Sequence, residues 1–185
     1  RLADLIKADG FAVHLNPLQE FLQPEGNPEF RGALKGIEML VKELPIPVIV
    51  KEIGAGISLS VAKRLLDVGV TIIDVAGAGG TSWAGVEILR RAKGKGKLSK
   101  TAGDSKRSAH AFWDWGIPTV DSILNVKKVA PRMTIIASGG IKDGIDIAKC
   151  IALGATLGGM AGQFLKAAAI SCEKVLDLCT LTTRQ

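Results

Sequence analysis

The sequence has few of the features that stabilise secreted or membrane proteins. Its three cysteines, Cys150, Cys172 and Cys179, are odd in number and lack the CxxC spacing of a metal or redox site. No run of 18 apolar residues is present and no signal peptide is visible, which argues against a membrane span and against secretion. We therefore expect reduced thiols in a cytoplasmic protein with no membrane partner.

Acidic residues are also in the minority, with 18 Asp and Glu against 24 Lys and Arg, so that the net charge is +6. Much of the excess lies between Arg90 and Arg107, where Asp104 is the only acid. This segment is rich in glycine and serine as well, which predicts a flexible, solvated basic loop over residues 92–111. A lid that closes over an anionic substrate is the alternative interpretation.

Short apolar runs rich in β-branched residues recur along the chain, which is typical of parallel strands covered on both faces. The runs are 11–15, 48–51, 71–75, 134–138 and 157–160. The segments between them have helical periodicity, and helix starts are expected at Asn27–Pro28, at Ser58 or Ser60, and at Asp143. The alternation of the two patterns predicts an α/β fold with right-handed crossovers.

The number and spacing of these units favour a barrel over an open sheet. Five units occupy about 150 residues, so eight would need about 240, the usual size of a (β/α)8 barrel. No GxGxxG fingerprint of a dinucleotide-binding sheet follows any run. We therefore predict a (β/α)8 TIM barrel, present as a fragment that lacks roughly the first three strands. Residues 1–185 would be the C-terminal part of a single domain.

Glycine-rich stretches follow the last two runs. The stretch ASGGIKDG contains Gly139 and Gly140, and GGMAGQ contains Ala161 and Gly162. The loops after the last two barrel strands commonly hold a phosphate, and glycine lets backbone N–H groups approach its oxygens. We expect a phosphate site here, with tight turns that bind nothing as the alternative.

The first run ends in polar side chains, in the stretch HLNPLQE. Strand alternation puts His14 and Asn16 on one face, toward the barrel mouth. Pro17 is expected to turn the chain, so that Gln19 and Glu20 follow in a loop. Glu20 suits Mg2+, which takes only one or two carboxylates besides substrate phosphates. The pattern indicates a substrate that carries phosphate and metal, whereas a lone histidine would more often be structural.

Other candidates lie at the ends of the second and third runs. A helix starting at Ser82 would place Trp83 and Glu87 four residues apart on one face. A structural tryptophan beside a surface glutamate is the alternative. Lys51 closes the second run and offers three donors and a charge to an anion or an electron-rich cofactor, although solvated lysines are commoner at strand ends.

Taken together, these blocks resemble type II isopentenyl diphosphate isomerase, the flavin-dependent family that interconverts isopentenyl and dimethylallyl diphosphate in isoprenoid biosynthesis. The blocks are HLNPLQE, VIVKEIGAGIS, DVAGAGGTSWAGVE, IASGGIKDGIDIAKCIALGA and GMAGQFL. The resemblance spans nearly the whole chain. It implies an FMN-binding barrel that uses reduced FMN and Mg2+, with NADPH as reductant, and a homo-oligomer of four or more subunits.

The resemblance also implies residue roles. The substrate ligands would be His14, Asn16 and Gln19, and Glu20 would bind Mg2+. The catalytic residues facing the alkene would be Gln19, Trp83 and Glu87, with the flavin N5 region a candidate for proton delivery. The FMN contacts would be Lys51, Ala76, Thr81, Gly139, Gly140, Ala161 and Gly162. Many members have a serine in place of Ala76, so any bond there must come from the backbone.

The family's N-terminal basic residues would precede Arg1, so this stretch alone is expected to be inactive. Rival FMN barrels fit less well. Inosine monophosphate dehydrogenase-like enzymes need a cysteine that AGAGGTSW lacks, and 2-hydroxy-acid oxidases use a late histidine with an arginine. A nucleic-acid-binding surface would pair the basic loop with Phe112, Trp113 and Trp115. We expect no nucleic-acid partner, because a core rich in phosphate-loop signals gains nothing from one.

Overall fold

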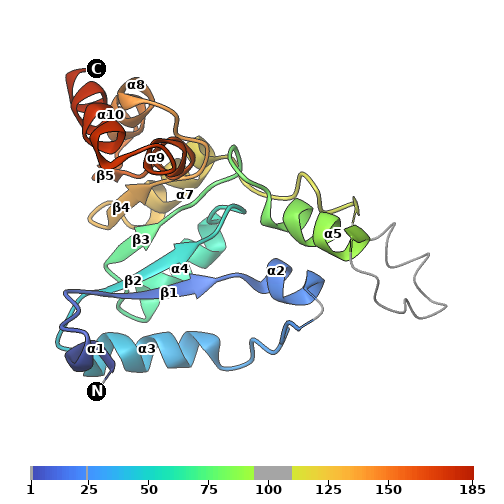
Figure 1. Cartoon of the computed structure of the whole chain (residues 1–185). Coiled ribbons are helices and arrows are strands. Elements are labelled where there is room, and N and C mark those ends of the chain that lie inside the picture. Colours follow the sequence, from blue (N-terminus) through green and yellow to red (C-terminus); the bar gives the residue numbers. More distant parts are fainter. Residues whose placement is uncertain (1, 24, 94–109) are drawn as a thin grey trace.

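The computed structural model describes residues 2–23, 25–93 and 110–185. Five parallel strands form one sheet in sequential order, as Figure 1 shows. They are β1 (Phe11–Leu15), β2 (Val48–Glu52), β3 (Ile72–Asp74), β4 (Thr134–Ala137) and β5 (Leu157–Gly158). All five predicted runs are strands, although the last is shorter than expected.

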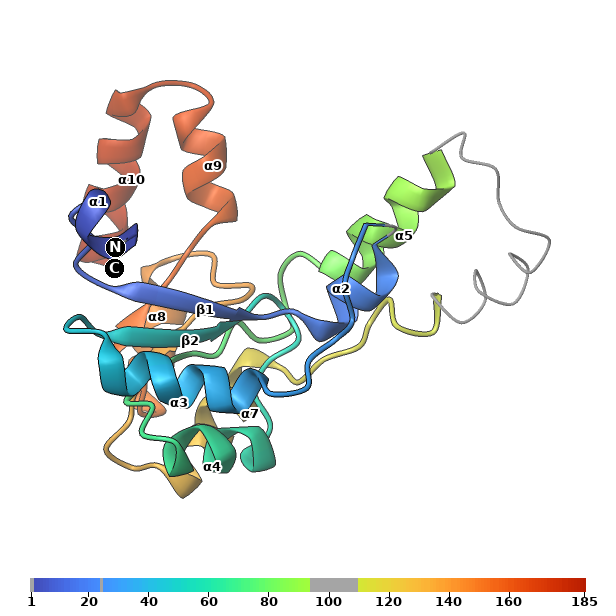
Figure 2. The same cartoon turned by 90° about the horizontal axis from the view of Figure 1, so that it is seen from below.

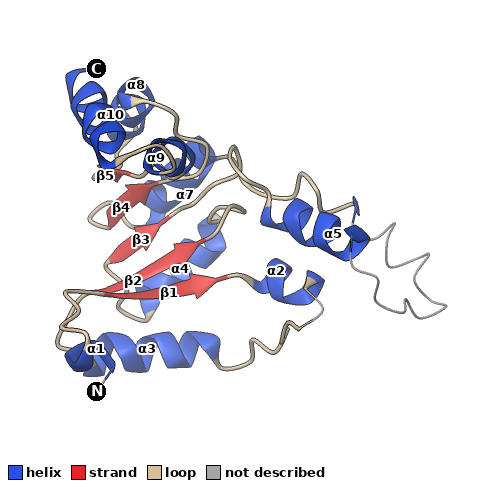
Figure 3. Cartoon of the chain, in the orientation of Figure 1, coloured by secondary structure: helices blue, strands red, loops and turns tan. Residues whose placement is uncertain are grey.

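Helices alternate with the strands along the chain, as the blue and red elements of Figure 3 show. They are α1 (Leu2–Leu5), α2 (Pro17–Leu22), α3 (Ala33–Glu43), α4 (Leu59–Asp67), α5 (Trp83–Lys93), α7 (Thr119–Val129), α8 (Gly144–Ala152), α9 (Gly162–Ala168) and α10 (Cys172–Arg184).

One face of the sheet carries the main hydrophobic core. Val50, Ile73 and Ile135 pair in one register row and are fully buried. They belong to one cluster with side chains of α3, α4, α7 and α8, among them Leu65 and Ile123. Figure 2 shows α3, α4 and α7 on the same side of the strands. Sequential strand order with this one-sided cover matches a barrel section, because an open doubly wound sheet carries helices on both faces.

The side chains of the adjacent row of paired residues point to the opposite face of the sheet. In this row His14 pairs with Lys51, Lys51 with Asp74, and Asp74 with Ile136. Successive side chains of a strand alternate between faces, so these four share the face that corresponds to the barrel interior. The predicted site residues His14 and Lys51 therefore lie side by side at the C-terminal ends of their strands.

Two expected helix starts are confirmed and one is wrong. Ser58 caps α4 through the N–H of Val61, and Asp143 caps α8 through the N–H of Asp146. The start at Asn27–Pro28 is wrong, because α3 begins only at Ala33, after Gly32 with a left-handed φ of 81°. The N–H of Asn27 is held instead by the carboxylate of Glu20.

The stretch after β1 also differs from expectation. It is the short helix α2, with Pro17 in its first turn, and not a loop. Its Leu22 packs with Ala84 and Ile88 of α5 in a second cluster, against which Phe112 and Trp113 lie. Figures 1 and 2 both show α2 beside α5 beyond the strand ends. Phe112 and Trp113 are thus used in packing, which removes most of the proposed base-stacking surface.

Most of the predicted basic loop lies in residues 94–109, outside the described residues. Its first two residues, 92–93, are helical and end α5. Cys150 is buried on the core-facing side of α8, whereas Cys172 and Cys179 are exposed on α10, and all three are free thiols. Across the described ranges, we find no helix with both the length and the apolar character needed to span a bilayer.

Candidate active site

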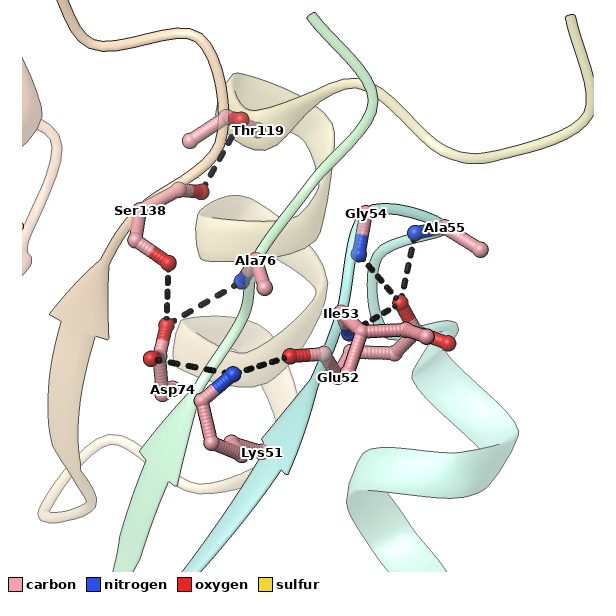
Figure 4. Close-up of polar contacts among 9 residues, drawn as sticks. All are labelled: Lys51, Glu52, Ile53, Gly54, Ala55, Asp74, Ala76, Thr119 and Ser138. Atoms are coloured by element: carbon pink, nitrogen blue, oxygen red, sulfur yellow. Dashed lines mark hydrogen bonds and ion pairs between the residues drawn. The ribbon is translucent and has the colours of Figure 1, made fainter. Parts of the chain in front are cut away.

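A polar network joins the tips of β2, β3 and β4 (Figure 4). The Nζ of Lys51 donates to the carbonyl oxygen of Glu52 at 2.8 Å and lies 3.9 Å from Oδ2 of Asp74. The Lys51 side chain is 25% exposed and that of Asp74 is 13% exposed. The ammonium group is therefore held in place, on a side chain that remains partly exposed.

Asp74 is fixed by the neighbouring strand. Its Oδ1 accepts a hydrogen bond from Oγ of Ser138 at 2.6 Å and another from the N–H of Ala76 at 3.2 Å. The sequence reasoning treated Asp74 only as the end of a strand and gave Ser138 no role. The sequence did contain a clue to this pair. Asp74 ends an apolar strand, and Lys51 ends the preceding strand.

Glu52 is a second carboxylate that the sequence reasoning missed. Its Oε2 accepts the N–H groups of Ile53, Gly54 and Ala55 at 2.6, 2.8 and 2.5 Å. Burial raises the pKa of Glu52, and these backbone hydrogen bonds oppose the rise. Glu52 therefore fixes the loop after β2, against which the chain near Thr81 lies.

The glycine loops after β3 and β4 pack against each other through their backbones. Gly139 has a φ of 99°, and a Cβ there would lie 2.1 Å from the carbonyl oxygen of Gly77. The N–H of Gly77 donates to the carbonyl of Ser138, and Thr119 Oγ1 donates to that of Gly139 at 2.6 Å. Within the described chain, the N–H groups of Gly139 and Gly140 have no protein acceptor. This arrangement fits an anion such as phosphate.

The loop after β5 runs beside the loop after β4. The N–H of Gly159 donates to the carbonyl of Ala137, and a Cβ on Gly159 would lie 3.3 Å from that of Ser138. Ala161 and Gly162 are exposed at the start of α9. The structure therefore brings the two predicted phosphate loops to neighbouring positions.

Ala76 and Thr81, the other predicted FMN contacts, differ in accessibility. Ala76 is buried with a φ of 34°; its N–H donates to Asp74 and its carbonyl accepts from Gly56. Both of its backbone groups thus already have protein partners. Thr81 is exposed, and its carbonyl would lie 3.0 Å from a Cβ on Gly54.

Glu20 is held at the start of α2. Its Oε1 accepts from Nδ2 of Asn16 at 2.9 Å, and its Oε2 accepts from the N–H of Asn27 at 2.8 Å. The bond from Asn27, followed by that from Asn16, lowers the pKa of Glu20. No cluster of three or more His, Cys, Asp or Glu suited to a metal occurs in the ranges that the structure covers. The single carboxylate fits Mg2+ only if phosphate oxygens and waters complete the coordination.

Gln19 and Glu87, 68 residues apart, meet between α2 and α5. Nε2 of Gln19 donates to Oε1 of Glu87 at 3.3 Å, and the Glu87 side chain is only 4% exposed. Arg90, assigned from sequence to the basic segment, donates to Oε2 of Glu87 at 3.1 Å and also pairs with Glu25. The signal for this pairing was the three-residue spacing from Glu87 to Arg90 on one helix.

Trp83 is 43% exposed and lines a small pocket together with Asn16 and Gln19. Glu87 does not line this pocket itself but is hydrogen-bonded to Gln19, which does. His14 is exposed in the register row of Lys51. The structure therefore gathers most of the predicted substrate and catalytic residues at one end of the sheet.

A larger cavity of about 720 Å³ lies on the helix-covered side, between α3, α4 and the sheet. Its lining is mainly apolar, from residues such as Leu34, Ile37 and Val61. This lining does not suit a diphosphate, which needs donors and cations.

Comparison with known proteins gives close relatives. The curated isopentenyl-diphosphate delta-isomerase of Pseudescherichia vulneris is 52% identical over 178 residues, which cover 96% of this chain and 48% of that protein. The enzyme of the same name from Rickettsia akari (strain Hartford) is 49% identical over 184 residues, covering 100% and 51%. The chain thus spans about half the length of the curated relatives it matches. This identity confirms the resemblance predicted from the sequence blocks.

Solved structures share the fold at lower identity. A mandelate oxidase structure with (S)-mandelic acid is 20% identical, with a TM-score of 0.54 over 82% of this chain and 36% of that one. A GMP reductase from Trypanosoma brucei is 22% identical, with a TM-score of 0.50 over 87% and 27%. Both are (β/α)8 barrels, which confirms the predicted fold class. Because the profile of the FMN-dependent dehydrogenase family matches residues 12–181, the chain belongs to that family and its five strands form a section of its barrel.

Proposed function

We propose that the protein to which this chain belongs is an FMN-dependent isomerase that interconverts isopentenyl and dimethylallyl diphosphate. The observation that carries the proposal is the Gln19–Glu87 hydrogen bond beside Trp83, at the end of the sheet where barrel enzymes act. The isomerase name of relatives about 50% identical to this chain supports it. Residues 1–185 would be the C-terminal part of a single FMN-binding domain.

The residues at the strand tips fit FMN. Lys51 is a partly exposed cation on the barrel-interior face, and the N–H groups of Gly139 and Gly140 suit the phosphate. Ala161 and Gly162 would add phosphate contacts from the neighbouring loop, and Thr81 would contact the ring. The backbone of Ala76 would have to share its existing hydrogen bonds. When bound, reduced FMN would supply an electron-rich surface against the alkene and a site for proton delivery.

His14, Asn16 and Gln19 would bind the diphosphate. Glu20 would hold Mg2+ against the phosphate oxygens, because its carboxylate is a hard oxygen ligand that is ionised at neutral pH. The bond from Asn16 to Glu20 would place the substrate ligand and the metal ligand at a fixed separation.

The reaction adds a proton at one carbon of the alkene and removes a proton from another, so atoms and electrons balance without net oxidation. Glu87 can hold or accept a proton, and the amide of Gln19 lies between this carboxylate and the pocket. The face of Trp83 would stabilise the positive charge that develops on the tertiary carbon.

The remaining features are proposed from the family resemblance and the sequence. NADPH would reduce the flavin, the enzyme would assemble as a homo-oligomer of four or more subunits, and it would act in the cytoplasm without a membrane or nucleic-acid partner.

The decisive experiment is an isomerase assay on the full-length protein with FMN, NADPH and Mg2+ omitted in turn. We expect each omission to lower the rate strongly. Activity that survives removal of the flavin would reject the proposal.

Two variants test the alkene-facing residues. Gln19→Ala and Glu87→Ala should each lower kcat by about 100-fold or more while FMN stays bound. Glu43→Ala, which removes an exposed carboxylate from α3, is the matched control and should retain the parent rate. Full activity in both site variants would remove Gln19 and Glu87 from the mechanism.

A further inference from the structure

We propose that Asp74 and Ser138 are positioning residues that compensate the charge of Lys51 and fix its orientation toward bound flavin. This inference rests on the proposed FMN site, and neither residue was assigned a role by the sequence or the resemblance. Figure 4 shows the three side chains at the tips of neighbouring strands, pointing toward one another.

The two oxygens of Asp74 have different partners. Oδ1 accepts from Ser138 Oγ at 2.6 Å and from the N–H of Ala76, whereas Oδ2 faces Lys51 Nζ at 3.9 Å. The carboxylate therefore cannot rotate toward Lys51 without losing both bonds to Oδ1. One oxygen anchors the group, and the other compensates the charge of the lysine.

Ser138 connects this ion pair to the proposed phosphate loop. Its carbonyl accepts from the N–H of Gly77 at 2.9 Å and from Thr119 Oγ1 at 3.2 Å, and Gly139 follows directly. A shift of the phosphate loop would therefore move Ser138 and, through its hydroxyl, Asp74. The contact that fixes the phosphate loop thereby also fixes the lysine that would face the flavin ring.

The charges around Lys51 predict the direction in which the preference for reduced over oxidised flavin should change. Lys51 and Asp74 are partly buried, so their interaction is screened less than a surface pair. His14 is the other titratable side chain in this register row. Neutralising Asp74 leaves the positive charge of Lys51 uncompensated, which favours the more negative reduced flavin over the oxidised form.

The test uses Asp74→Asn in the full-length protein, because asparagine keeps an Oδ1 acceptor for Ser138 and Ala76 and replaces the charged oxygen that faces Lys51 by a neutral amide group. The dissociation constants of oxidised and anaerobically reduced FMN are measured without isoprenoid substrate. We expect the ratio of oxidised to reduced Kd to rise about tenfold, equivalent to a midpoint potential about 30 mV more positive. Asp67→Asn, which neutralises an exposed partner of Lys63 on α4, should leave the ratio unchanged.

Two further variants keep the proposal open to refutation. Ser138→Ala retains the Asp74 charge but releases its anchor, so that the carboxylate can turn toward Lys51 and compensate its charge more fully. A shift of about twofold in the opposite direction is therefore expected, even if Asp74→Asn does not fold. In a Lys51→Gln background, Asp74→Asn should no longer change the ratio. An unchanged ratio in folded Asp74→Asn or in Ser138→Ala overturns the inference, as does an effect that persists without Lys51.

These outcomes separate the inference from the proposed function. If the wild-type protein binds FMN and isomerises its substrate but the variants show no shift, only the proposed role of Asp74 and Ser138 is rejected. If the wild-type protein binds no FMN, both the inference and the proposed function are rejected.

Discussion

At the scale of single residues, Glu52 shows how a buried charge can organise a loop and still oppose folding. Its carboxylate accepts three consecutive N–H groups, yet desolvation is the largest influence and raises its pKa above the ordinary value of 4.5. Below pH 4.5 the group is protonated in both folded and unfolded chains. As the pH rises, the unfolded chain releases the proton first, so ionisation of Glu52 removes stability until the folded state has ionised as well.

We therefore expect wild-type protein to lose stability relative to Glu52→Gln as the pH rises from about 4.5 toward neutrality. The slope would be at most about 1.4 kcal/mol per pH unit. Urea denaturation of the full-length pair at pH 4, 5, 6 and 7 measures the difference. Glu43→Gln on the exposed side of α3 is the control and should give a flat difference. A wild-type advantage that grows with pH would contradict the assigned direction of the shift.

At the scale of elements, the glycines after β3 and β4 allow the backbones of the two loops to pack against each other, whether or not a ligand is bound. Each loop occupies the space that a side chain on the other would need, and Gly139 combines this closeness with a left-handed φ. The start of α9 is different, since a Cβ on Gly162 meets no atom within 4 Å. The two predicted phosphate loops therefore differ in their tolerance of a methyl group.

This difference predicts opposite outcomes for the same substitution. Gly139→Ala should destabilise the protein by about 3 kcal/mol or more, because a methyl group 2.1 Å from a carbonyl oxygen must push the two loops apart. Gly162→Ala should be neutral or slightly stabilising. Thermal unfolding of both variants checks this, and equal melting temperatures would show that the loops can separate freely.

The elements also show how far the sequence could be interpreted unaided. Strands were predictable because β-branched runs and burial reinforce each other, and the caps Ser58 and Asp143 act through local bonds. The start of α3 was not predictable in this way, because the N–H of Asn27 bonds to the carboxylate of Glu20 in α2 instead of starting a helix. The roles of Asp74 and Arg90 depend on partners 64 and 65 residues away, which only the folded sheet and the α2–α5 contact bring within reach.

At the scale of the whole molecule, the sheet has two open edges. Within the described residues β1 pairs only with β2, and β5 only with β4. The face opposite the core is also less covered, with Ala12 exposed and Ile49 and Ile72 half-buried. In a closed barrel the edges are paired and this face is filled by interior side chains.

We therefore expect the 185-residue chain, prepared by itself, to associate through these edges in a concentration-dependent manner. Light scattering coupled to gel filtration over a dilution series measures the effect. Ala12→Lys places a charge on the edge strand β1 and should lower the average mass. Ala148→Lys on the exposed surface of α8 is the matched control and should leave it unchanged. A monomer at every concentration would argue against open-edge association.

The placement of the three sulfurs has a practical consequence for following such changes. Cys172 and Cys179 lie in contact with solvent, whereas Cys150 lies on the buried side of α8, and burial is the main cause of its raised pKa. Alkylating reagents attack the thiolate, so they would modify two sites on the intact chain and reach the third only after the helix layer lifts from the strands. Mass spectrometry of the labelled chain would then count opened molecules directly, without an added dye or an engineered tag.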